Sequence, residues 1–400
     1  MDYERSLLTT LTSRLTEPRK FIQVIAGPRQ VGKTTLAIQL RDQWKGLAAY
    51  HSADDVQSGG DIWIDQLWES LRVHMRLEQA NEALLILDEI QKINDWSAAI
   101  KKNWDKDARE KTKIKLVLLG SSRLLLMDGL SESLTGRYEL IYAGHWSFAE
   151  MKEAFGYSAE EYIWFGGYPG TAAFAGDEPR FKEYIRNSIV EPTMVRDILM
   201  TAKIDKPALL RQLFDIGSAY SAQIVSYTKM LGQLQNAGNT TTLARYLKLL
   251  EQAGLLSGLN KYSGSPIQIK GTIPKFQIHN TALLSAMQVK SFEEALVDPG
   301  NWGNIFESSV GTHLLDLTLR HAEADLYYWR EKNCEIDYVL VFGDRILGIE
   351  VKSTGDMLSA KNKDAFRRHY PSAALLLVGE NGLPYESFMQ ADLSDLFRSV

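Results

Sequence analysis

The sequence predicts an α/β protein with a parallel sheet that has helices on both faces, followed by a helical region and a second α/β region. The first sheet is predicted by three apolar runs of strand length that alternate with helix-forming stretches. The second α/β region is predicted by two strand-like runs on either side of a two-residue Gly-Asp loop. With 400 residues, the chain exceeds the roughly 250–300 residues at which single cores stop growing, so two or three domains are expected.

The composition is that of an ordinary globular protein, with 45% hydrophobic and 24% charged residues. The net charge of −5 is not typical of a nucleic-acid-binding protein, although it can conceal a local basic patch. Cys334 is the only cysteine, which excludes an intramolecular disulfide and a thiolate-rich metal site. We see neither a secretory signal nor a run of roughly 18 apolar residues, so we expect a cytoplasmic protein without a membrane partner.

The first apolar run, Lys20 to Ala26, leads into the loop GPRQVGKTT and then into a helix-forming stretch. This is the P-loop pattern, in the strand–loop–helix context that the pattern requires. Backbone N–H groups of such a loop surround phosphate, Lys33 adds a positive charge, and the Thr34 hydroxyl is placed for Mg²⁺. The predicted ATP contacts are Gly27, Pro28, Arg29, Gln30, Val31, Gly32, Lys33, Thr34 and Thr35.

A second motif supports the first. The run Ala83 to Leu87 ends in Asp88 and Glu89, where a buried parallel strand delivers its carboxylates to the ligand-binding edge of a sheet. We expect Asp88 to hold Mg²⁺ and Glu89 to orient or deprotonate water. The alternative is an acidic helix start after a strand. Together the two motifs predict Mg²⁺-dependent binding and hydrolysis of ATP.

Two weaker signals follow. Ser121 and Ser122 end the third apolar run and are candidate sensors of the terminal phosphate, or else a turn or helix cap. Arg137 is a candidate arginine finger, and Arg29 is a weaker candidate for the same role. A surface salt bridge is the alternative for Arg137.

On these motifs, together with GGYPG at Gly166–Gly170 and the terminal EIDYVL…GIEVKS, the chain resembles the AAA+ superfamily of ring-forming ATPases. More narrowly, it resembles a bacterial and archaeal family in which an AAA+ module precedes a C-terminal domain of largely unknown function. The resemblance implies a homo-oligomeric ring, in which an arginine finger commonly comes from a neighbouring subunit.

The segment from Lys206 to Tyr262 is predicted to form three helices and carries six basic and two acidic residues. In its third helix, capped by Asn239, apolar residues recur at helical spacing and leave a polar face. This is how the recognition helix of a winged helix presents itself to DNA, although winged helices also serve as protein-docking modules. The candidate DNA contacts are Thr241, Thr242, Arg245 and Lys248.

The hairpin around Gly343-Asp344 has a register fixed by its two-residue loop. That register places Asp337 opposite Glu350 and Glu335 opposite Lys352, with one apolar, buried face behind them. Two carboxylates so close repel unless a cation lies between them, which predicts a divalent metal site. The alternative is a surface hairpin with an ordinary Glu335–Lys352 ion pair.

Asp337, Glu350 and Lys352 match the signature of the PD-(D/E)XK nuclease fold, which this region resembles. The resemblance adds Glu307 as a helical glutamate, so that Glu307, Asp337 and Glu350 would hold Mg²⁺ or Mn²⁺ and Lys352 would polarise water. We therefore predict four segments, which are an AAA+ P-loop ATPase core (1–160), a helical lid or connector (161–205), a winged-helix-like module (206–262) and a nuclease-like domain (263–400).

The leading hypothesis is an ATPase that couples hydrolysis to DNA handling, with a possible metal-dependent endonuclease at its C-terminal end. The alternative is a signalling ATPase whose C-terminal domain is a non-cutting interaction module. A small-molecule kinase would explain the P-loop and leave the rest of the chain without a role.

Overall fold

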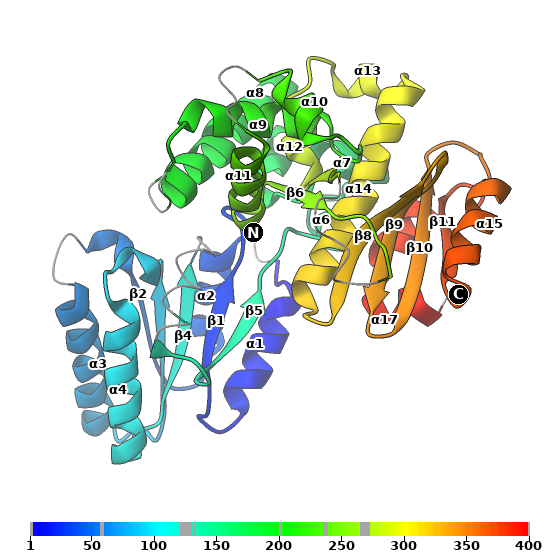
Figure 1. The fold of residues 1–400 in the computed structure, drawn as a ribbon. Helices are drawn as coiled ribbons and strands as arrows, with labels where there is room; N and C mark the ends of the chain where they lie inside the picture. Colours follow the sequence, from blue (N-terminus) through cyan, green and yellow to red (C-terminus); the bar gives the residue numbers. More distant parts are fainter. Residues whose placement is uncertain are drawn as a thin grey trace. The chain divides into compact units, whose positions relative to one another are not determined.

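The computed structural model describes residues 3–56, 60–120, 130, 133–199, 202, 204–234, 239–264 and 273–398. Contacts divide the chain into two compact units, Met1–Gly144 and His145–Val400. The described residues of the first unit contain one sheet and those of the second unit contain two, and each unit has its own helices (Figure 1). In the part of the chain that the structure describes, no helix is long and apolar enough to cross a membrane.

The first unit contains a five-stranded sheet of order β2-β3-β4-β1-β5, in which every neighbouring pair is parallel. Every residue of β1, β3 and β4 is buried, as is usual for strands covered on both faces. The strands are β1 (Ile22–Ala26), β2 (Leu47–Ser52), β3 (Ala83–Asp88), β4 (Ile114–Gly120) and β5 (Tyr138–Tyr142).

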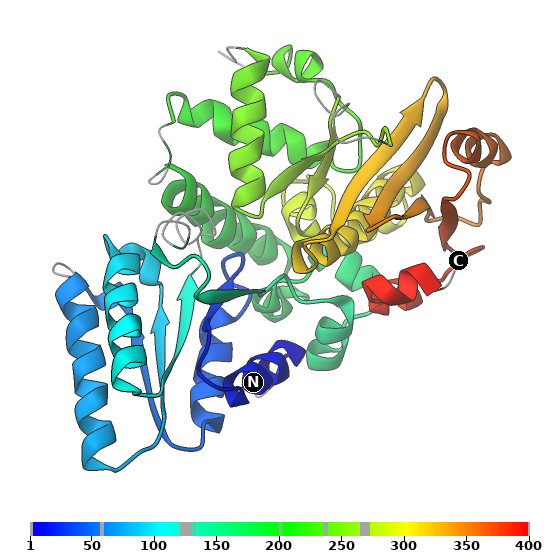
Figure 2. The same cartoon turned by 60° about the horizontal axis from the view of Figure 1, so that its bottom comes forward.

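Helices cover both faces of this sheet (Figure 2). On one face, α1 (Ser6–Thr16) and α2 (Lys33–Gln43) pack against alternate strand residues such as Ile86. On the other face, α3 (Gly60–Leu77) and α4 (Trp96–Glu110) pack against the residues between them, such as Leu85. The predicted parallel sheet with helices on both faces is therefore confirmed. Short 3-10 turns, η1 (Ala53–Asp55) and η2 (Ile90–Lys92), follow β2 and β3.

The second unit begins with helical segments, two of which, η4 and η5, are π-helical. They are α6 (Phe148–Phe155), α7 (Ala159–Phe165), η3 (Pro169–Phe174), α8 (Glu178–Tyr184), η4 (Ile185–Val190) and η5 (Thr193–Leu199). The GGYPG element lies between α7 and η3, where backbones approach closely. A Cβ on Gly166 would lie 1.9 Å from the Asn280 side chain, and one on Gly167 would lie 2.1 Å from the Trp146 carbonyl oxygen. These two glycines are therefore needed for packing.

Three helices and a two-stranded antiparallel sheet follow, with an isolated bridge between Ile224 and Lys275. The three helices are as predicted: Asn239 accepts a hydrogen bond from the backbone N–H of Thr242, and Leu243 is buried. The elements are α9 (Pro207–Ala219), α10 (Tyr227–Leu231), α11 (Thr240–Gln252), β6 (Leu256–Leu259) and β7 (Lys275–Ile278). Because β7 pairs with β6, this arrangement extends beyond residue 262.

The chain ends in a four-stranded sheet of order β11-β10-β9-β8, in which only the β10–β11 pair is parallel. Its strands are β8 (Ala324–Glu331), β9 (Cys334–Phe342), β10 (Arg345–Lys352) and β11 (Ala374–Gly379). The helices of this region are α12 (Thr281–Ser285), α13 (Phe292–Leu296), α14 (Pro299–Arg320), α15 (Ala360–His369), α16 (Tyr385–Gln390) and α17 (Leu393–Arg398).

The predicted register of the β9–β10 hairpin is confirmed from the Phe342–Arg345 pair to the Tyr338–Ile349 pair. The expectation of a single buried face is wrong. The pairing of β9 with β8 shifts between Tyr327 and Trp329, so the side-chain alternation changes along β9. Ile336 and Val339 both pack in a cluster that includes Phe366 of α15. The hydroxyl of Tyr338 instead donates to the Glu307 carbonyl of α14, so both faces are covered.

Candidate functional site

The P-loop between β1 and α2 is tightly constrained at its glycines. A Cβ on Gly27 would lie 2.0 Å from the carbonyl oxygen of Ala143, which follows β5. Gly32 has a φ of 86° and Gln30 a φ of 61°, so the loop takes left-handed turns before the helix begins. This geometry turns successive backbone N–H groups inward, as anion-binding loops require.

The Lys33 side chain lies inside this loop. It is 6% exposed, and its ammonium donates to the carbonyl oxygens of Gly27 at 2.9 Å and Pro28 at 2.6 Å. The positive charge is therefore held within the turn whose amides would face phosphate. Lys33 is the first residue of α2, so the helix N-terminus adds a favourable dipole for an anion.

Thr34 and Asp88 meet next to the P-loop. The Thr34 hydroxyl donates to Asp88 Oδ2 at 2.7 Å, and the Tyr50 hydroxyl donates to the same oxygen at 2.9 Å. Burial and the neighbouring Asp88 raise the pKa of Tyr50, so its hydroxyl remains a donor at neutral pH. A hydroxyl and a carboxylate in contact are oxygen ligands of the kind that Mg²⁺ binds, so these residues fit the ion.

Tyr50 is absent from the sequence-based predictions because β2 has no strong strand pattern. Its segment, LAAYHS, is polar at its end and half-buried along its length. The parallel pairing of Tyr50 with Ile86 brings its side chain close to the end of β3. The signal that would have indicated Tyr50 is a tyrosine on the edge strand that neighbours the strand ending in Asp88 and Glu89.

Glu89 lies at the turn after β3. Its φ of 51° places it in the left-handed region, and its backbone N–H donates to Asp88 Oδ1 at 2.8 Å. The amide of Gln91 donates to Glu89 Oε2 at 2.6 Å. The Glu89 carboxylate is therefore oriented by a neighbour that the sequence-based prediction did not include.

The first unit contains four further candidate residues, which are Ser121, Ser122, Arg29 and Arg137. Ser121 and Ser122 lie outside the described residues, and Arg29 is half-buried in the P-loop. Arg137 makes two hydrogen bonds to Asp105 of α4, at 3.1 and 3.3 Å. It directly precedes β5, whereas the P-loop follows β1, and the two strands are parallel. Arg137 and the P-loop of the same chain therefore lie at opposite edges of the sheet.

In the second unit, Glu307 of α14, Asp337 of β9 and Glu350 of β10 form one electrostatic cluster with Lys352. Asp337 Oδ2 accepts from the backbone N–H of Val351 at 2.8 Å. Lys352 pairs with Glu350 at 2.9 Å, so the expected cross-strand partner of Lys352, Glu335, is not its ion-pair partner. Glu335 instead lies 3.8 Å from Arg330 of β8.

Lys275 also belongs to this cluster, although the sequence-based prediction does not include it. Its ammonium donates to Glu307 Oε1 at 2.6 Å and to the carbonyl oxygen of Asp337 at 2.9 Å. It comes from β7, 32 positions before Glu307, and its side chain is fully buried. No sequence motif spans that distance.

Two carboxylates of the cluster, Glu307 and Glu350, are difficult to ionise. Burial, and then the charge of Asp337, raise the pKa values of both Glu307 and Glu350. Burial lowers the pKa of Lys275, but the charges of Glu307 and Asp337 outweigh burial, so the net shift is upward. Positive charge close to the carboxylates therefore stabilises the cluster.

As arranged, this cluster does not fit a divalent metal ion. Among the described residues, no group of three or more His, Cys, Asp or Glu side chains is placed to hold a metal ion. The two lysine ammonium groups engage Glu307 and Glu350, which leaves Glu350 Oε2 buried without a hydrogen-bond partner. The residues that were predicted to form a nuclease site are brought together, but the cations among them are the ammonium groups of Lys275 and Lys352.

The outward face of α11 is polar. Thr241, Arg245 and Lys248 are exposed and Thr242 is half-buried, while Leu243 on the opposite face is buried. Lys248 pairs with Glu251 of its own helix at 3.3 Å. The four candidate DNA contacts therefore lie along one accessible helix face.

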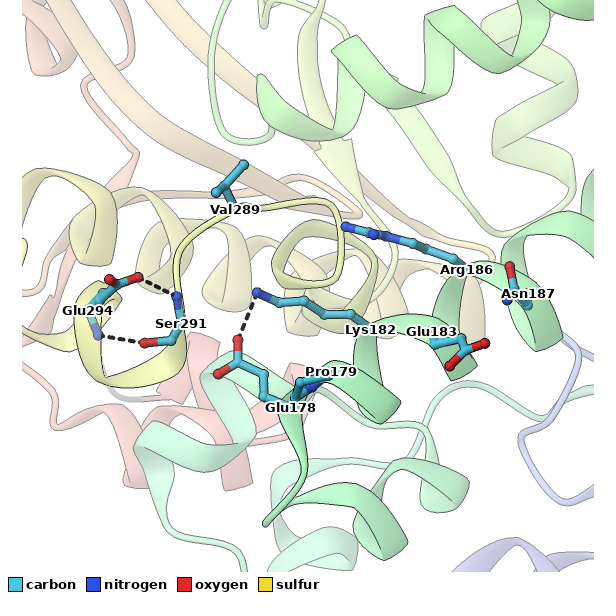
Figure 3. Close-up of a pocket in the computed structure, with 9 residues that line it drawn as sticks. All are labelled: Glu178, Pro179, Lys182, Glu183, Arg186, Asn187, Val289, Ser291 and Glu294. Atoms are coloured by element: carbon cyan, nitrogen blue, oxygen red, sulfur yellow. Dashed lines mark hydrogen bonds and ion pairs between the residues drawn. The ribbon is translucent and has the colours of Figure 1, made fainter.

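A separate pocket of the second unit lies between α8, η4 and the segment that leads into α13 (Figure 3). Its charged groups connect these elements to one another. Lys182 pairs with Glu178 at 2.9 Å, and Glu178 accepts from the backbone N–H of Phe292. Ser291 and Glu294 bond reciprocally as the cap of α13. None of the predicted site residues lies in this pocket.

Comparison with known proteins identifies the class of the first unit. Residues 19–152 match the model of an AAA domain. Together with the parallel sheet and the P-loop, this match supports a P-loop AAA+ ATPase fold for the first unit, and such a fold supports ATP binding and hydrolysis. Residues 157–294 and 302–391 match two further models, each described as a domain of unknown function (DUF8612 and DUF4143).

Two relatives match most of the chain at low identity. The chain is 26% identical over 378 residues to an uncharacterized protein of Mycobacterium tuberculosis, covering 94% of this chain and 80% of the relative. It is also 26% identical over 352 residues to an uncharacterized protein of Haemophilus influenzae, covering 83% of this chain and 82% of the relative.

Two solved structures match part of the chain at lower identity. The Thermotoga maritima RuvB Holliday junction branch migration motor matches with a TM-score of 0.34 and 18% identity, covering 63% of this chain and 86% of RuvB. The Aeropyrum pernix ORC1 protein in complex with DNA matches with a TM-score of 0.31 and 12% identity, covering 73% of this chain and 92% of ORC1. At these TM-scores, neither structure supports a functional conclusion.

Proposed function

We propose that this protein is a Mg²⁺-dependent ATPase in which Lys33 binds the terminal phosphates and Thr34 and Asp88 hold the metal ion. The observation that carries the proposal is the 2.7 Å contact between Thr34 and Asp88 beside a P-loop that encloses Lys33. The metal ion supplies charge neutralisation at the transferred phosphoryl group. Glu89, oriented by Gln91, is placed to position or deprotonate the attacking water.

We infer that the ATPase works as a homo-oligomer in which Arg137 acts on a neighbouring subunit. Its place at the opposite edge of the sheet from its own P-loop supports action in trans. An arginine at this position would neutralise charge that develops on the transferred phosphate. The ion pair with Asp105 would orient the guanidinium between catalytic events.

We further propose that hydrolysis is coupled to DNA handling through the region from α9 to β7. Three helices followed by a two-stranded antiparallel sheet are the elements of a winged helix, and the bridge at Ile224 supplies a short first strand. The exposed face of α11 carries Arg245 and Lys248 for phosphate contacts and Thr241 for polar contacts to DNA. The segment 206–262 has a net charge of +4, which suits a polyanion.

One experiment tests the proposed ATPase activity and its proposed coupling to DNA. ATP turnover of the full chain would be measured with and without duplex, single-stranded and branched DNA, and DNA integrity would be followed by gel in the same Mg²⁺-containing samples. We expect turnover to rise with at least one DNA form, and Arg245→Ala/Lys248→Ala to lose that stimulation while keeping basal turnover. Turnover that ignores every DNA form would contradict the coupling but not the ATPase.

A second candidate function concerns the C-terminal sheet. A nuclease-like domain could cut DNA with Lys352 polarising the attacking water, or it could be a non-cutting interaction module. The buried ammonium of Lys275 at Glu307 favours the non-cutting module, because a cutting site would need those carboxylates for metal ions. Mg²⁺-dependent cleavage of DNA that is abolished by Lys352→Ala and retained in Lys33→Ala would count against the non-cutting module.

A further inference from the structure

Lys275 is the least expected residue of the C-terminal cluster. Its side chain has no exposed surface, and buried lysines are rare because removing an ammonium group from water is costly. Three features stabilise it there: the Glu307 carboxylate at 2.6 Å, the Asp337 carbonyl oxygen at 2.9 Å and the Tyr338 ring, whose centroid is 4.5 Å away. A carboxylate, a carbonyl oxygen and an aromatic ring around one buried ammonium group indicate a site that is shaped to hold a cation.

The same partners are oxygen ligands of a kind that a divalent cation prefers, namely a carboxylate and a backbone carbonyl. Around them lie the carboxylates of Asp337, Glu335 and Glu350, all of which act electrostatically on Lys275 or Lys352. Without a cation, such a group of buried carboxylates would repel itself. The Oε2 atom of Glu350 is buried without a hydrogen-bond partner, so the cluster retains unused capacity for a cation.

We propose that the ammonium of Lys275 takes the place of a divalent cation in this cluster, so that Glu307 and Asp337 can bind a metal ion only when Lys275 is displaced or removed. The inference rests on the second candidate function, the non-cutting module, and gives its physical cause. It also assigns a role to β7, which pairs with β6 through its backbone while it delivers its first side chain to the carboxylates.

Mn²⁺ binding provides a direct test that does not depend on catalysis. The full chain would carry Asp88→Asn, which removes the metal ligand of the first unit, and would be titrated with Mn²⁺ without nucleotide, by calorimetry and by electron paramagnetic resonance. Adding Lys275→Gln should tighten Mn²⁺ binding by about tenfold or more, because one competing unit charge leaves the carboxylates. Further addition of Glu307→Gln should remove the gain.

Lys229→Gln is the matched control, because Lys229 is an exposed lysine of the same unit, on α10. It should leave Mn²⁺ binding unchanged. If Lys275→Gln binds Mn²⁺ no more tightly than the parent protein, the proposal is overturned. If Lys275→Gln is unfolded in chelator, recovery of its circular dichroism with Mn²⁺ would support the replacement of ammonium by metal, and no recovery at any Mn²⁺ concentration would overturn it.

The outcome is separable from that of the proposed function. ATP turnover and its response to DNA, measured on chains that retain Asp88, report on the ATPase and its coupling. Mn²⁺ binding to the Lys275 variants reports only on the cluster. Tight Mn²⁺ binding by the parent protein, together with DNA cleavage, would remove the non-cutting module and this inference together while leaving the ATPase intact.

Discussion

The hydroxyl of Thr34 donates a hydrogen bond to Asp88 over 2.7 Å, although the two residues are 54 positions apart in the chain. Parallel pairing of β1 with β4 and of β4 with β3 brings the carboxyl ends of the strands to one edge, where the P-loop and the end of β3 converge. The contact places a hydroxyl and a carboxylate together at the start of α2. It is the geometric basis for the metal ion that we propose beside the phosphates of ATP.

Lys33→Ala should abolish most ATP turnover. The substitution removes the positive charge held inside the P-loop, and loss of a preorganised charge of this kind costs about 10²–10³ in rate. Steady-state phosphate release at saturating ATP would measure the effect. Arg41→Ala, on the exposed C-terminal part of α2, is the control and should retain turnover. Unchanged hydrolysis by Lys33→Ala would show that the P-loop is not the hydrolytic site.

Tyr50→Phe should weaken the apparent affinity for Mg²⁺ without abolishing turnover. The change removes one of the two hydroxyl donors to Asp88 Oδ2, worth about 1 kcal/mol, so a severalfold higher Mg²⁺ concentration should be needed for half-maximal turnover. The maximal rate at saturating Mg²⁺ should fall less. Equal Mg²⁺ titration curves for the parent and Tyr50→Phe would rule out this positioning role.

Arg137→Ala should be inactive alone and partly rescued by mixing with Lys33→Ala. In a mixed oligomer, an intact P-loop of one subunit can meet an intact Arg137 of its neighbour, so turnover should exceed that of either protein by itself. Fold stability should change little, because the Arg137–Asp105 pair is about one-third exposed and such pairs contribute about 0–1 kcal/mol. Mixtures no more active than their components would argue against action in trans.

The second unit should lose stability as the pH falls below about 6.5. Burial lowers the pKa of His313 from 6.5 to about 4, and it outweighs the hydrogen bond that His313 Nε2 donates to the Ala391 carbonyl oxygen at 3.2 Å. The unfolded chain therefore binds a proton between pH 6.5 and 4 that the folded chain does not, which favours unfolding by at most about 1.4 kcal/mol per pH unit. Urea unfolding of the parent and His313→Gln at pH 7.5 and pH 5 would measure this.

The parent should lose more stability between these two pH values than His313→Gln does. Glutamine keeps a donor for Ala391 but has no titratable group, so the variant isolates the protonation of the ring. Equal losses in the two proteins would mean that other groups account for the pH dependence.

Much of the proposed ATPase site could be predicted from sequence because its chemistry lies in contiguous motifs. The P-loop and the Asp88-Glu89 strand end each carry their own local pattern, and the order of strands in an α/β sheet brings them together. Tyr50 and Lys275 could not be predicted in this way. Each lies on a strand with a weak pattern and reaches a partner that is distant in the sequence, Tyr50 through strand pairing and Lys275 through packing of β7 near α14, which no local spacing encodes.

The β9–β10 hairpin could be predicted in part from the sequence and depends in part on tertiary packing. Its Gly-Asp loop fixed the register correctly near the turn, because a two-residue loop allows one pairing. The change of alternation along β9 depends on β8 and on the helices that cover both faces, so the single buried face was wrong. Local sequence determined the turn, and tertiary packing determined the faces.

The position of Lys275 has a consequence for how the chain can be divided. The region that matches a family model at the C-terminal end begins at residue 302 and contains Glu307 but not Lys275. A fragment cut at that boundary would keep the Lys352–Glu350 pair but would leave Glu307 without its ammonium partner. We expect such a fragment to fold poorly unless the preceding β7 is included. We therefore expect the portion that folds independently to be longer than the portion that matches the family model.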